Sequence, residues 1–215
     1  MISKEYLKIV NHYNSCLDRY GDTHLGVDWP KEKDVDTRYR IMLEVINSWA
    51  DDQITLLDFG CGLSHLYEFI LKQNSDRINY ISKIKYSGLD LSEKFIQVSQ
   101  NKFPLNTYYC LDILDTSIEI PIFDYVVLNG VFTEKRELTF DQMFVYFKFL
   151  IKKVFSKTRN GFAFNVMSKQ VDWERDDLFH LPLDTLASFL TKDISRNFII
   201  RNDYGLYEYT TYVYR

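Results

Sequence analysis

Short apolar runs alternate with helix-forming stretches along most of this chain, from Ile54 onward. Each apolar run has the length of a buried strand, and the runs lie at residues 55–58, 86–90, 107–112, 125–129 and 161–167. Apolar residues at helical spacing occupy residues 66–72, 94–102 and 140–155, and a further helix is expected after Pro182. Because this alternation is typical of βαβ units, the sequence predicts an α/β fold with a doubly wound, mostly parallel sheet.

The two ends of the chain depart from this alternation. Near the N-terminus, apolar residues recur at helical spacing from Tyr6 to Leu17 and again from Tyr39 to Trp49, which predicts an N-terminal helical cap over residues 1–50. Near the C-terminus, residues 198–201 and 207–214 flank a turn that contains Gly205, which predicts an antiparallel hairpin. Because no linker rich in Pro, Gly or Ser interrupts the chain, we expect residues 1–215 to form a single domain with its core over residues 54–215.

Charge and hydropathy exclude several partners. The formal net charge is −4, whereas a protein that binds nucleic acid needs a basic surface to neutralise phosphates. One short basic cluster lies between Lys148 and Arg159, toward the end of a predicted helix, where we expect it to be solvated. The chain has neither an apolar targeting segment nor a stretch of about 18 uncharged apolar residues, so we expect a cytoplasmic protein without a membrane partner. The oligomeric state is left open.

The cysteines are Cys16, Cys61 and Cys110, an odd number without a pair at metal-ligand or redox spacing. We therefore expect reduced, buried thiols, no disulfide and no metal site.

A glycine-containing loop follows the first predicted strand and immediately precedes a helix. Asp58 ends the strand, and Gly60 and Gly62 allow a tight turn in which a ligand can approach the backbone without meeting a Cβ atom. A dinucleotide fingerprint would have a third glycine at position 65, where this chain has His65, so the loop disfavours a nicotinamide cofactor.

Asp58-x-Gly60-x-Gly62 after a strand resembles the first motif of the class I S-adenosylmethionine-dependent methyltransferases, which have a Rossmann-like fold. Further elements follow in that family's order, because Asp90 and Asp112 close the second and third strands and residues 123–131 form the fourth strand and its exit. The resemblance covers residues 54–215. It implies a transferase that uses S-adenosyl-L-methionine and releases S-adenosyl-L-homocysteine.

The resemblance also implies roles for residues at the strand ends. Asp90 would accept the ribose hydroxyls, since a carboxylate offers two acceptor oxygens, and its replacement by alanine is expected to weaken cofactor binding more than folding. Leu91 would cover the adenine, with Asp112 accepting from the adenine amino group and the backbone of Ile113 donating to the ring. The methionine portion would be contacted by Asn129 and Gly130.

The acceptor side is predicted from composition. The segment 22–30, called the lid loop below, joins two predicted helices and contains His24 and Trp29 among turn-forming residues. Arg38 follows in the second cap helix, where a guanidinium can clamp an anion. With Phe132 after the fourth strand, Tyr204 and Tyr207 near the hairpin, and the loop 171–180, these residues are expected to line a pocket for a small-molecule acceptor. We expect the cap to lie over the carboxyl ends of the strands and to supply these contacts.

His24 is the predicted catalytic residue, because a hydroxyl acceptor with a high pKa needs a base to remove its proton. Asp22 and Thr23 are equally explained as turn or capping residues, and Trp29 as a core residue. The exit of the fourth strand, Asn129-Gly130-Val131-Phe132, differs from the Asn/Asp-Pro-Pro-aromatic sequence of amino-directed nucleic-acid methyltransferases. The sequence therefore favours O-methylation of a metabolite or a polysaccharide building block. A cofactor-binding regulator without catalysis and a nicotinamide-dependent oxidoreductase are the alternatives.

Overall fold

The computed structural model describes residues 4–47, 53–76, 83–115 and 119–215. Its α-helices, 3-10 helices (η) and strands are, in chain order, η1 (Lys4–Tyr6), α1 (Leu7–Tyr20), η2 (His24–Val27), η3 (Glu32–Asp34), α2 (Val35–Leu43), β1 (Ile54–Phe59), α3 (His65–Asp76), β2 (Ile84–Asp90), α4 (Glu93–Lys102), β3 (Thr107–Cys110), β4 (Phe123–Phe132), α5 (Phe140–Ser156), β5 (Thr158–Ser168), β6 (His180–Leu181), α6 (Leu183–Asp193), β7 (Phe198–Arg201) and β8 (Glu208–Tyr214).

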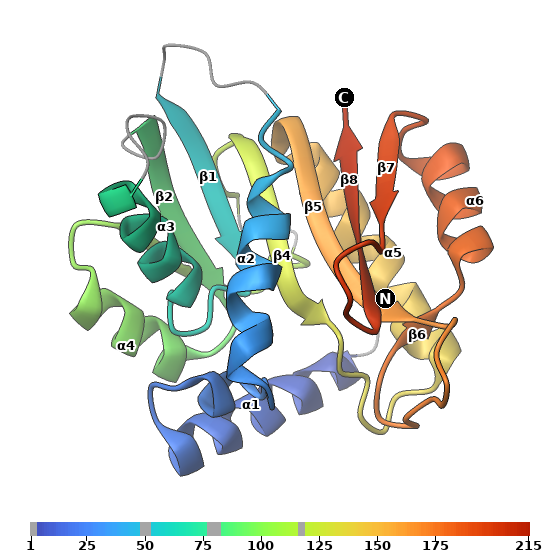
Figure 1. Cartoon of the computed structure of the whole chain (residues 1–215), viewed down its shortest axis with the longest axis horizontal. Coiled ribbons are helices and arrows are strands. Elements are labelled where there is room, and N and C mark those ends of the chain that lie inside the picture. The colour runs from blue at the N-terminus through green and yellow to red at the C-terminus, as the bar shows by residue number, and fades with distance from the viewer. Residues whose placement is uncertain (1–3, 48–52, 77–82, 116–118) are drawn as a thin grey trace.

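One twisted sheet forms the centre of the molecule, with the strand order β3-β2-β1-β4-β5-β8-β7 (Figure 1). Strands β1 to β5 pair in parallel, whereas β8 is antiparallel to both of its neighbours, β5 and β7. The predicted doubly wound sheet with an antiparallel C-terminal hairpin is therefore confirmed. The chain proceeds outward in one direction from β1 to β3 and in the other from β4 to β5, so the order reverses between β1 and β4. Open α/β sheets bind ligands at such a reversal.

Helices cover both faces of the sheet, and each face has its own apolar core. On one face α5 and α6 bury Phe147 and Leu190 against strand residues such as Val126 and Phe164. On the other face α2 and α3 bury Met42 and Ile70. Because both faces of the central strands are covered, these strands are apolar almost throughout instead of alternating with polar residues.

Local signals in the sequence explain where several helices begin and end. The Thr139 hydroxyl accepts from the backbone N–H of Gln142 at 3.2 Å and the Gln142 side chain accepts from the backbone N–H of Thr139 at 2.8 Å, which forms a capping box for α5. Ser92 caps α4 in the same position, and α1 ends at Gly21 with φ of 61°.

The N-terminal cap divides into two parts. Helix α1 lies across the carboxyl ends of the parallel strands (Figure 1), where Asn14 accepts from the Ser92 hydroxyl at 2.5 Å and Asp18 pairs with Lys94 at 2.7 Å. Helix α2 instead packs on a face of the sheet, because Tyr39, Ile41 and Met42 are buried there. The expectation that the whole cap covers the strand ends is thus correct for α1 and wrong for α2.

Other differences concern the ends of elements. Helix α2 ends at Leu43, whereas the second cap helix was expected to reach Trp49, a residue that lies outside the described ones along with residues 1–3, 48 and 50. Strand β3 ends at Cys110, before Asp112, and the two-residue strand β6 was not predicted. Both differences concern short or terminal segments, in which little apolar periodicity exists to detect.

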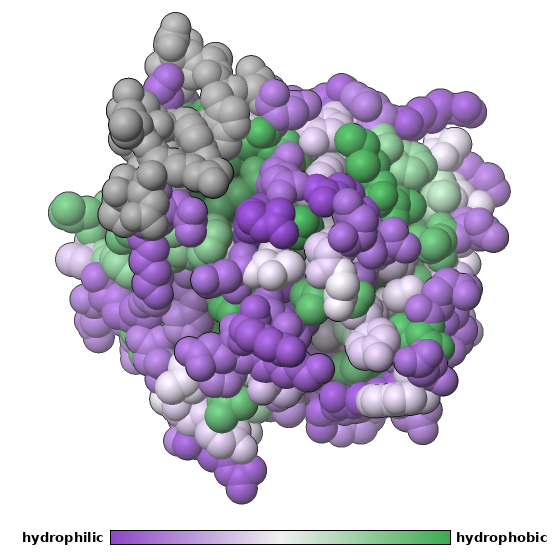
Figure 2. Space-filling view, in the orientation of Figure 1, coloured by the Kyte–Doolittle hydropathy of each residue, from purple (hydrophilic) through white to green (hydrophobic). Residues whose placement is uncertain are grey.

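The surface agrees with the expected solvation of charged residues. In the predicted basic cluster, Lys152 pairs with Asp193, Lys157 with Glu119, and Arg159 with a further carboxylate, Asp124. Figure 2 shows that polar residues cover most of the visible face, with apolar residues in small separate groups. None of the helices within the described ranges combines the length and apolar character that crossing a membrane requires.

Phe147 is the best single test of this core. Its side chain is fully buried, and its ring lies 4.7 Å from that of Phe132 and 5.4 Å from that of Phe164, measured between centroids. Phe147→Ala should lower the free energy of unfolding by about 3–5 kcal/mol, because a large apolar side chain is replaced by a cavity. Urea denaturation measures this. The matched control, Phe149→Ala, removes a ring that is 51% exposed on the same helix and should change stability by less than about 0.5 kcal/mol. Equal losses in the two variants would contradict the packing described above.

Candidate functional site

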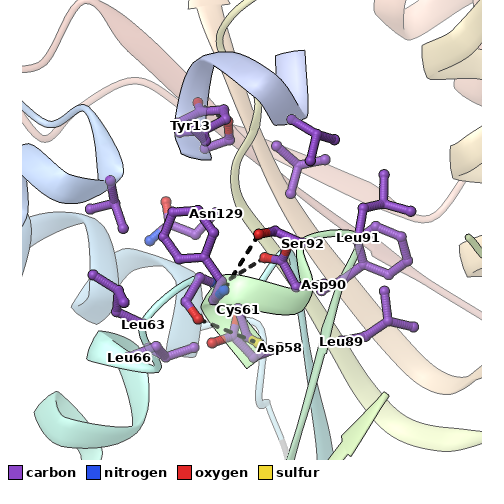
Figure 3. A pocket seen from close by; sticks show the side chains of 18 of the residues that line it. Tyr13, Asp58, Cys61, Leu63, Leu66, Leu89, Asp90, Leu91, Ser92 and Asn129 are labelled. Carbon is purple, nitrogen blue, oxygen red and sulfur yellow. Dashed lines mark hydrogen bonds between the residues drawn. The ribbon is translucent and has the colours of Figure 1, made fainter. Parts of the chain in front are cut away.

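A cavity lies at the carboxyl ends of β1, β2 and β4, beneath α1. Figure 3 shows Tyr13 of α1 at the top and Asp58, Cys61 and Asp90 below it, with labelled leucines to the left and to the right of the acids. This cofactor cavity, as we call it below, brings together eight of the residues named from the sequence: Trp29, Asp58, Gly60, Gly62, Asp90, Leu91, Asn129 and Gly130.

The glycine loop forms the floor of the cofactor cavity. Its first two backbone N–H groups, of Gly60 and Cys61, donate to the carbonyl oxygen of Leu89 at 2.7 and 3.0 Å. Gly60 has φ of 72°, and a Cβ atom there would lie only 2.6 Å from a methyl carbon of Val131. A side chain at position 60 would therefore both strain the backbone and push β1 away from the exit of β4.

Asp90 holds the same loop from the next strand. Its carboxylate accepts from the backbone N–H of Gly62 at 3.0 Å and from that of Ser92 at 2.8 Å. Burial raises the pKa of Asp90, and these backbone hydrogen bonds act in the opposite direction. Asp90 thus has a structural role in addition to the cofactor contact implied by the resemblance.

Asp58 is a nearly fully buried carboxyl group at the end of β1, 3% exposed. It accepts from the hydroxyl of Tyr86 at 2.8 Å. Burial and the charge of Asp90 raise its pKa and the Tyr86 hydrogen bond lowers it, which together place the pKa at about 7. No cationic side chain among the described residues pairs with this carboxyl group, which lines the cavity.

Asn129 and Gly130 lie where β4 leaves the sheet. Both polar atoms of the Asn129 side chain are inaccessible to solvent and have no hydrogen-bond partner among the described residues. The backbone N–H of Gly130 donates to the Asn165 side-chain oxygen at 2.7 Å, and the Tyr13 hydroxyl donates to the carbonyl oxygen of Gly130 at 3.4 Å. The cavity is thus lined by an amide that has no partner and by a backbone segment that is held in place.

Two of the predicted adenine contacts, Asp112 and Ile113, are not among the residues that line the cofactor cavity. Asp112 accepts from the Tyr6 hydroxyl at 2.5 Å and from the backbone N–H of Leu114 at 2.9 Å, and Ile113 is buried in the core. Tyr6 lines the cavity instead. Contacts of Asp112 and Ile113 with a cofactor therefore stay predictions.

The contribution of η1 and α1 to the cavity was not predicted from the sequence. Tyr6 of η1 and Ile9, Val10 and Tyr13 of α1 all line it, and their spacing was interpreted only as the apolar face of an amphipathic helix. The available signal was the pair of tyrosines in that face, since a hydroxyl is seldom buried without a polar partner.

A second cavity, of about 300 Å³, adjoins the first, and Trp29 lines both. We call it the acceptor-side cavity. The expected loop after β5 contributes Asp172, Trp173 and His180, and Tyr207 also lines it. Thr133 and Glu134, which follow Gly130 along the same segment of chain, form part of its wall.

Arg38 lines the acceptor-side cavity, but its charge is already paired. Its Nε donates to both carboxylate oxygens of Glu208, at 3.1 and 3.0 Å, and its guanidinium lies 5.1 Å from the centroid of the Trp29 ring. Glu208 is 4% exposed and also accepts from the Asn165 side chain at 3.0 Å. The expected role of Arg38 as an anion clamp stays a prediction, because in this structure the guanidinium holds Glu208 and lies over Trp29.

Three other predicted acceptor-side residues line neither cavity. Phe132 is fully buried against Phe147 and Phe164, so the expected substrate contact is wrong. The Tyr204 hydroxyl is hydrogen bonded to Thr210 at 2.9 Å, and its ring packs against the core under α2. His24 lies in η2, half-buried and outside both linings, so its role as a base stays a prediction without a contact to support it.

Glu134 is a titratable residue that the sequence analysis did not single out. It is 5% exposed, and one of its oxygens lies 3.3 Å from the guanidinium of Arg136. Burial raises the pKa of Glu134, as do the charges of Asp28 and Asp177. A carboxylate with a raised pKa in the wall of a cavity is suited to accepting a proton.

The hydrogen bonds of Asp90 lead to the first prediction for this site. Asp90→Ala leaves the N–H groups of Gly62 and Ser92 without their acceptor, so the free energy of unfolding should fall by about 1–3 kcal/mol. From the sequence, the variant is expected to weaken cofactor binding more than folding, and these hydrogen bonds add a loss of stability. The matched control is Asp18→Ala, which removes only an exposed ion pair with Lys94 and should cost less than about 1 kcal/mol. An Asp90→Ala protein as stable as the control would show that the glycine loop does not need this carboxylate.

The buried acid gives the second prediction. An unfolded aspartate has a pKa of about 3.9, whereas burial raises that of Asp58 to about 7, so this group favours the folded state below pH 4 and loses that contribution as the pH rises to 7. Asp58→Asn cannot ionise and still accepts from Tyr86. The urea concentration at the midpoint of unfolding should therefore decrease for the wild type, relative to the Asp58→Asn variant, as the pH is raised from 4 to 8. A difference that is constant with pH would mean that Asp58 titrates normally.

In a comparison with known proteins, no family model matches the chain. Rv1506c of Mycobacterium tuberculosis, a protein designated a methyltransferase, is 24% identical over 176 residues, which are 80% of this chain and 98% of that protein.

Solved structures are similar over the whole chain. Magnesium protoporphyrin IX methyltransferase (ChlM) from Synechocystis PCC 6803, with bound S-adenosylmethionine, has a TM-score of 0.65 at 14% identity and covers 100% of this chain and 99% of its own. The 1,6-didemethyltoxoflavin-N1-methyltransferase of Burkholderia thailandensis, with 1,6-didemethyltoxoflavin and S-adenosylhomocysteine bound, has a TM-score of 0.61 at 14% identity and covers 98% of this chain and 86% of its own. The resemblance first found in the motifs is thereby confirmed in three dimensions, and the chain has the class I, Rossmann-like fold of the S-adenosylmethionine-dependent methyltransferases.

Proposed function

We propose that this protein is an S-adenosylmethionine-dependent methyltransferase that modifies a small molecule held in the acceptor-side cavity. The proposal is supported by a cofactor cavity lined by the buried carboxyl group of Asp58 and by the Asn129 amide, which has no partner among the described residues. Trp29 separates this cavity from a second one with a buried acid. The name of the Mycobacterium tuberculosis relative and the ligands bound in the similar structures support the same class of reaction.

The residues of the cofactor cavity fit S-adenosylmethionine. The cofactor carries an ammonium and a carboxylate at its methionine end, and the carboxyl group of Asp58 and the amide of Asn129 both lack such partners. Asp90 has lone pairs beyond those used by Gly62 and Ser92 and would accept the ribose hydroxyls. Leu91 would cover one face of the adenine, and Asp112 and Ile113 would reach its edge only if the Tyr6 hydroxyl moved.

When bound, this cofactor supplies an electrophilic methyl group on a sulfonium. The protein then has to hold an acceptor in line with that group and exclude water, and such positioning contributes up to about 7–11 kcal/mol in the best model systems. Helix α1 covers the cofactor cavity, and Trp29 lies against Gly130, with its indole nitrogen 3.4 Å from where a Cβ atom would stand. These residues would define the passage between the two cavities.

The acceptor-side cavity favours a compact, polar acceptor. Its volume of about 300 Å³ is at the lower end of the range for small-molecule sites. The similar proteins act on magnesium protoporphyrin IX and 1,6-didemethyltoxoflavin by name, which are small molecules of different size. For this chain we propose a hydroxyl group on a metabolite or a polysaccharide building block, since the wall of the cavity contains acids that can accept its proton.

Glu134 is better placed than His24 to accept that proton. It lines the acceptor-side cavity, follows Gly130 by four positions along the chain and has a raised pKa, so it holds a proton more readily than an exposed glutamate does. His24 would need a movement of the lid loop to reach the same place.

The two alternative functions would each require a different property of the site. A nicotinamide-dependent oxidoreductase would need room for a pyrophosphate at the start of α3, where the His65 ring is bound to Asp22 at 2.7 Å. A regulator without catalysis would bind the cofactor but would not turn over with any acceptor.

Calorimetric titration followed by an acceptor screen tests the proposal. S-adenosylhomocysteine should bind and NAD should not, and a metabolite panel should identify an acceptor that drives release of S-adenosylhomocysteine. Glu134→Gln should then lower turnover by about 10²–10⁴-fold with little change in cofactor affinity. The control is Glu137→Gln, an exposed position on the same connection. Heat with NAD alone would contradict the proposed cofactor, and a Glu134→Gln enzyme as active as the control would exclude Glu134 as the base.

A further inference from the structure

Three side chains that can bind a metal ion, those of His12, Cys16 and Asp28, lie close together between α1 and the lid loop. Of these, only Asp28 lines one of the two cavities. The Nε2 atom of His12 lies 2.7 Å from a carboxylate oxygen of Asp28 and 3.8 Å from the Sγ atom of Cys16. All three atoms lie within 4.8 Å of one another. Neither the cofactor cavity nor the proposed transfer step uses His12 or Cys16.

The backbone brings these side chains together from two segments. His12 and Cys16 are four residues apart on α1 and therefore share one face of that helix. Asp28 closes η2 with φ of 58°, a left-handed conformation that is uncommon outside glycine. Asp22, at the other end of the lid loop, is anchored by His65 and Lys102, so the position of the loop is determined from both ends.

The geometry argues against a proton relay. In a nucleophile–histidine–carboxylate relay the two partners use opposite nitrogens of the imidazole ring. Here Cys16 and Asp28 approach the same nitrogen, and a single N–H group cannot serve both of them well. Three donor atoms arranged around one point are the pattern expected of ligands to a common metal ion.

The charges around this point also favour a cation. Glu134 lies near enough to interact electrostatically with Asp28, His12 and Cys16. Arg136 compensates Glu134, and Arg19 acts on Cys16 from α1. Because Arg136 offsets Glu134, the charge that remains for a cation is that of the Asp28 carboxylate and of the Cys16 thiolate once it is formed, and a divalent ion would attract both.

We propose that His12, Cys16 and Asp28 bind Zn²⁺. Imidazole, thiolate and carboxylate are all zinc ligands, and the presence of a thiolate disfavours Mg²⁺ and Ca²⁺. A tetrahedral zinc ion would hold Nε2 and Sγ about 3.5 Å apart and Nε2 and the carboxylate oxygen about 3.3 Å apart. The first separation is close to that observed, and the second requires Asp28 to withdraw by about half an ångström.

Binding would release the proton of the Cys16 thiol to solvent, and the single proton of the neutral His12 ring would lie on Nδ1, which leaves Nε2 free to bind the ion. Three protein ligands leave a fourth position open, as in catalytic zinc sites. Asp28 also lines the acceptor-side cavity, so the proposed site borders the place of the proposed acceptor. A role of the ion in binding an acceptor hydroxyl rests on the proposed function, whereas zinc binding itself does not.

The sequence analysis expected no metal because it considered only cysteine spacings. The signal that it left aside is the i, i+4 pair of His12 and Cys16 on a predicted helix, which places two ligands on one face. The third ligand comes from a turn whose conformation the sequence does not reveal.

Metal binding can be measured without cofactor or acceptor. The full-length protein is treated with a chelator, freed of it and titrated with Co²⁺, and a thiolate-to-cobalt charge-transfer band should appear and saturate at about one ion per chain. Zn²⁺ should abolish the band by displacement. Cys16→Ser should remove it and weaken Zn²⁺ binding, followed by calorimetry, by more than about 100-fold, because even the loss of an outer-shell partner costs about 10–100-fold.

The matched control is Cys110→Ser, which removes an exposed thiol on β3 and should retain the band. Asp28→Asn provides a second variant if Cys16→Ser does not fold, and it should weaken Zn²⁺ binding while leaving the melting temperature of the metal-free protein nearly unchanged. A wild type without the band, or a band that persists in Cys16→Ser, would overturn the proposal and leave His12 and Asp28 as an ion pair. Failure to methylate any acceptor would leave this result unaffected.

Discussion

The close approach of the first two strands' carboxyl ends is the constraint on which the rest of the site depends. The carbonyl oxygen of Leu89 accepts from two successive N–H groups of the glycine loop, and Asp90 accepts from a third. These bonds turn the chain sharply from β1 into α3 and leave backbone, instead of side chains, facing the cavity. Asp58, Asp90 and Leu91 can line one small space only because the turn is this tight.

A second set of contacts connects the two cavities. Gly130 is held by Asn165, Asn165 by Glu208, and Glu208 by Arg38, whose guanidinium lies over Trp29. Trp29 in turn lies against Gly130. These contacts form a closed ring that joins the lid loop to the central strands. A shift of the Trp29 side chain on the acceptor side would therefore displace the backbone that borders the cofactor cavity.

The sequence predicts those parts of the fold and site that depend on local chemistry. Strand and helix periodicity and the glycines at 60 and 62 can each be recognised from a few neighbouring residues. Glu208 and Glu134 could not be identified in this way, because their roles depend on partners that the fold supplies from elsewhere, such as Arg38 for Glu208. Phe132 was misassigned for a related reason: the register between β4 and β5 shifts between Leu128 and Phe132, and Phe132 packs in the core while Gly130 and Thr133 line the cavities.

The antiparallel direction of β8 has a practical consequence. A strand that runs against its neighbours delivers its first residue, Glu208, to the end of the sheet where the parallel strands finish, and it carries Arg215 to the opposite end (Figure 1). The backbone N–H of Arg215 is bonded there to the carbonyl oxygen of Asn160, at the start of β5. An affinity tag or surface linker joined after Arg215 would therefore project away from α1 and both cavities, and the protein could be immobilised through it with its ligand entrances facing solution.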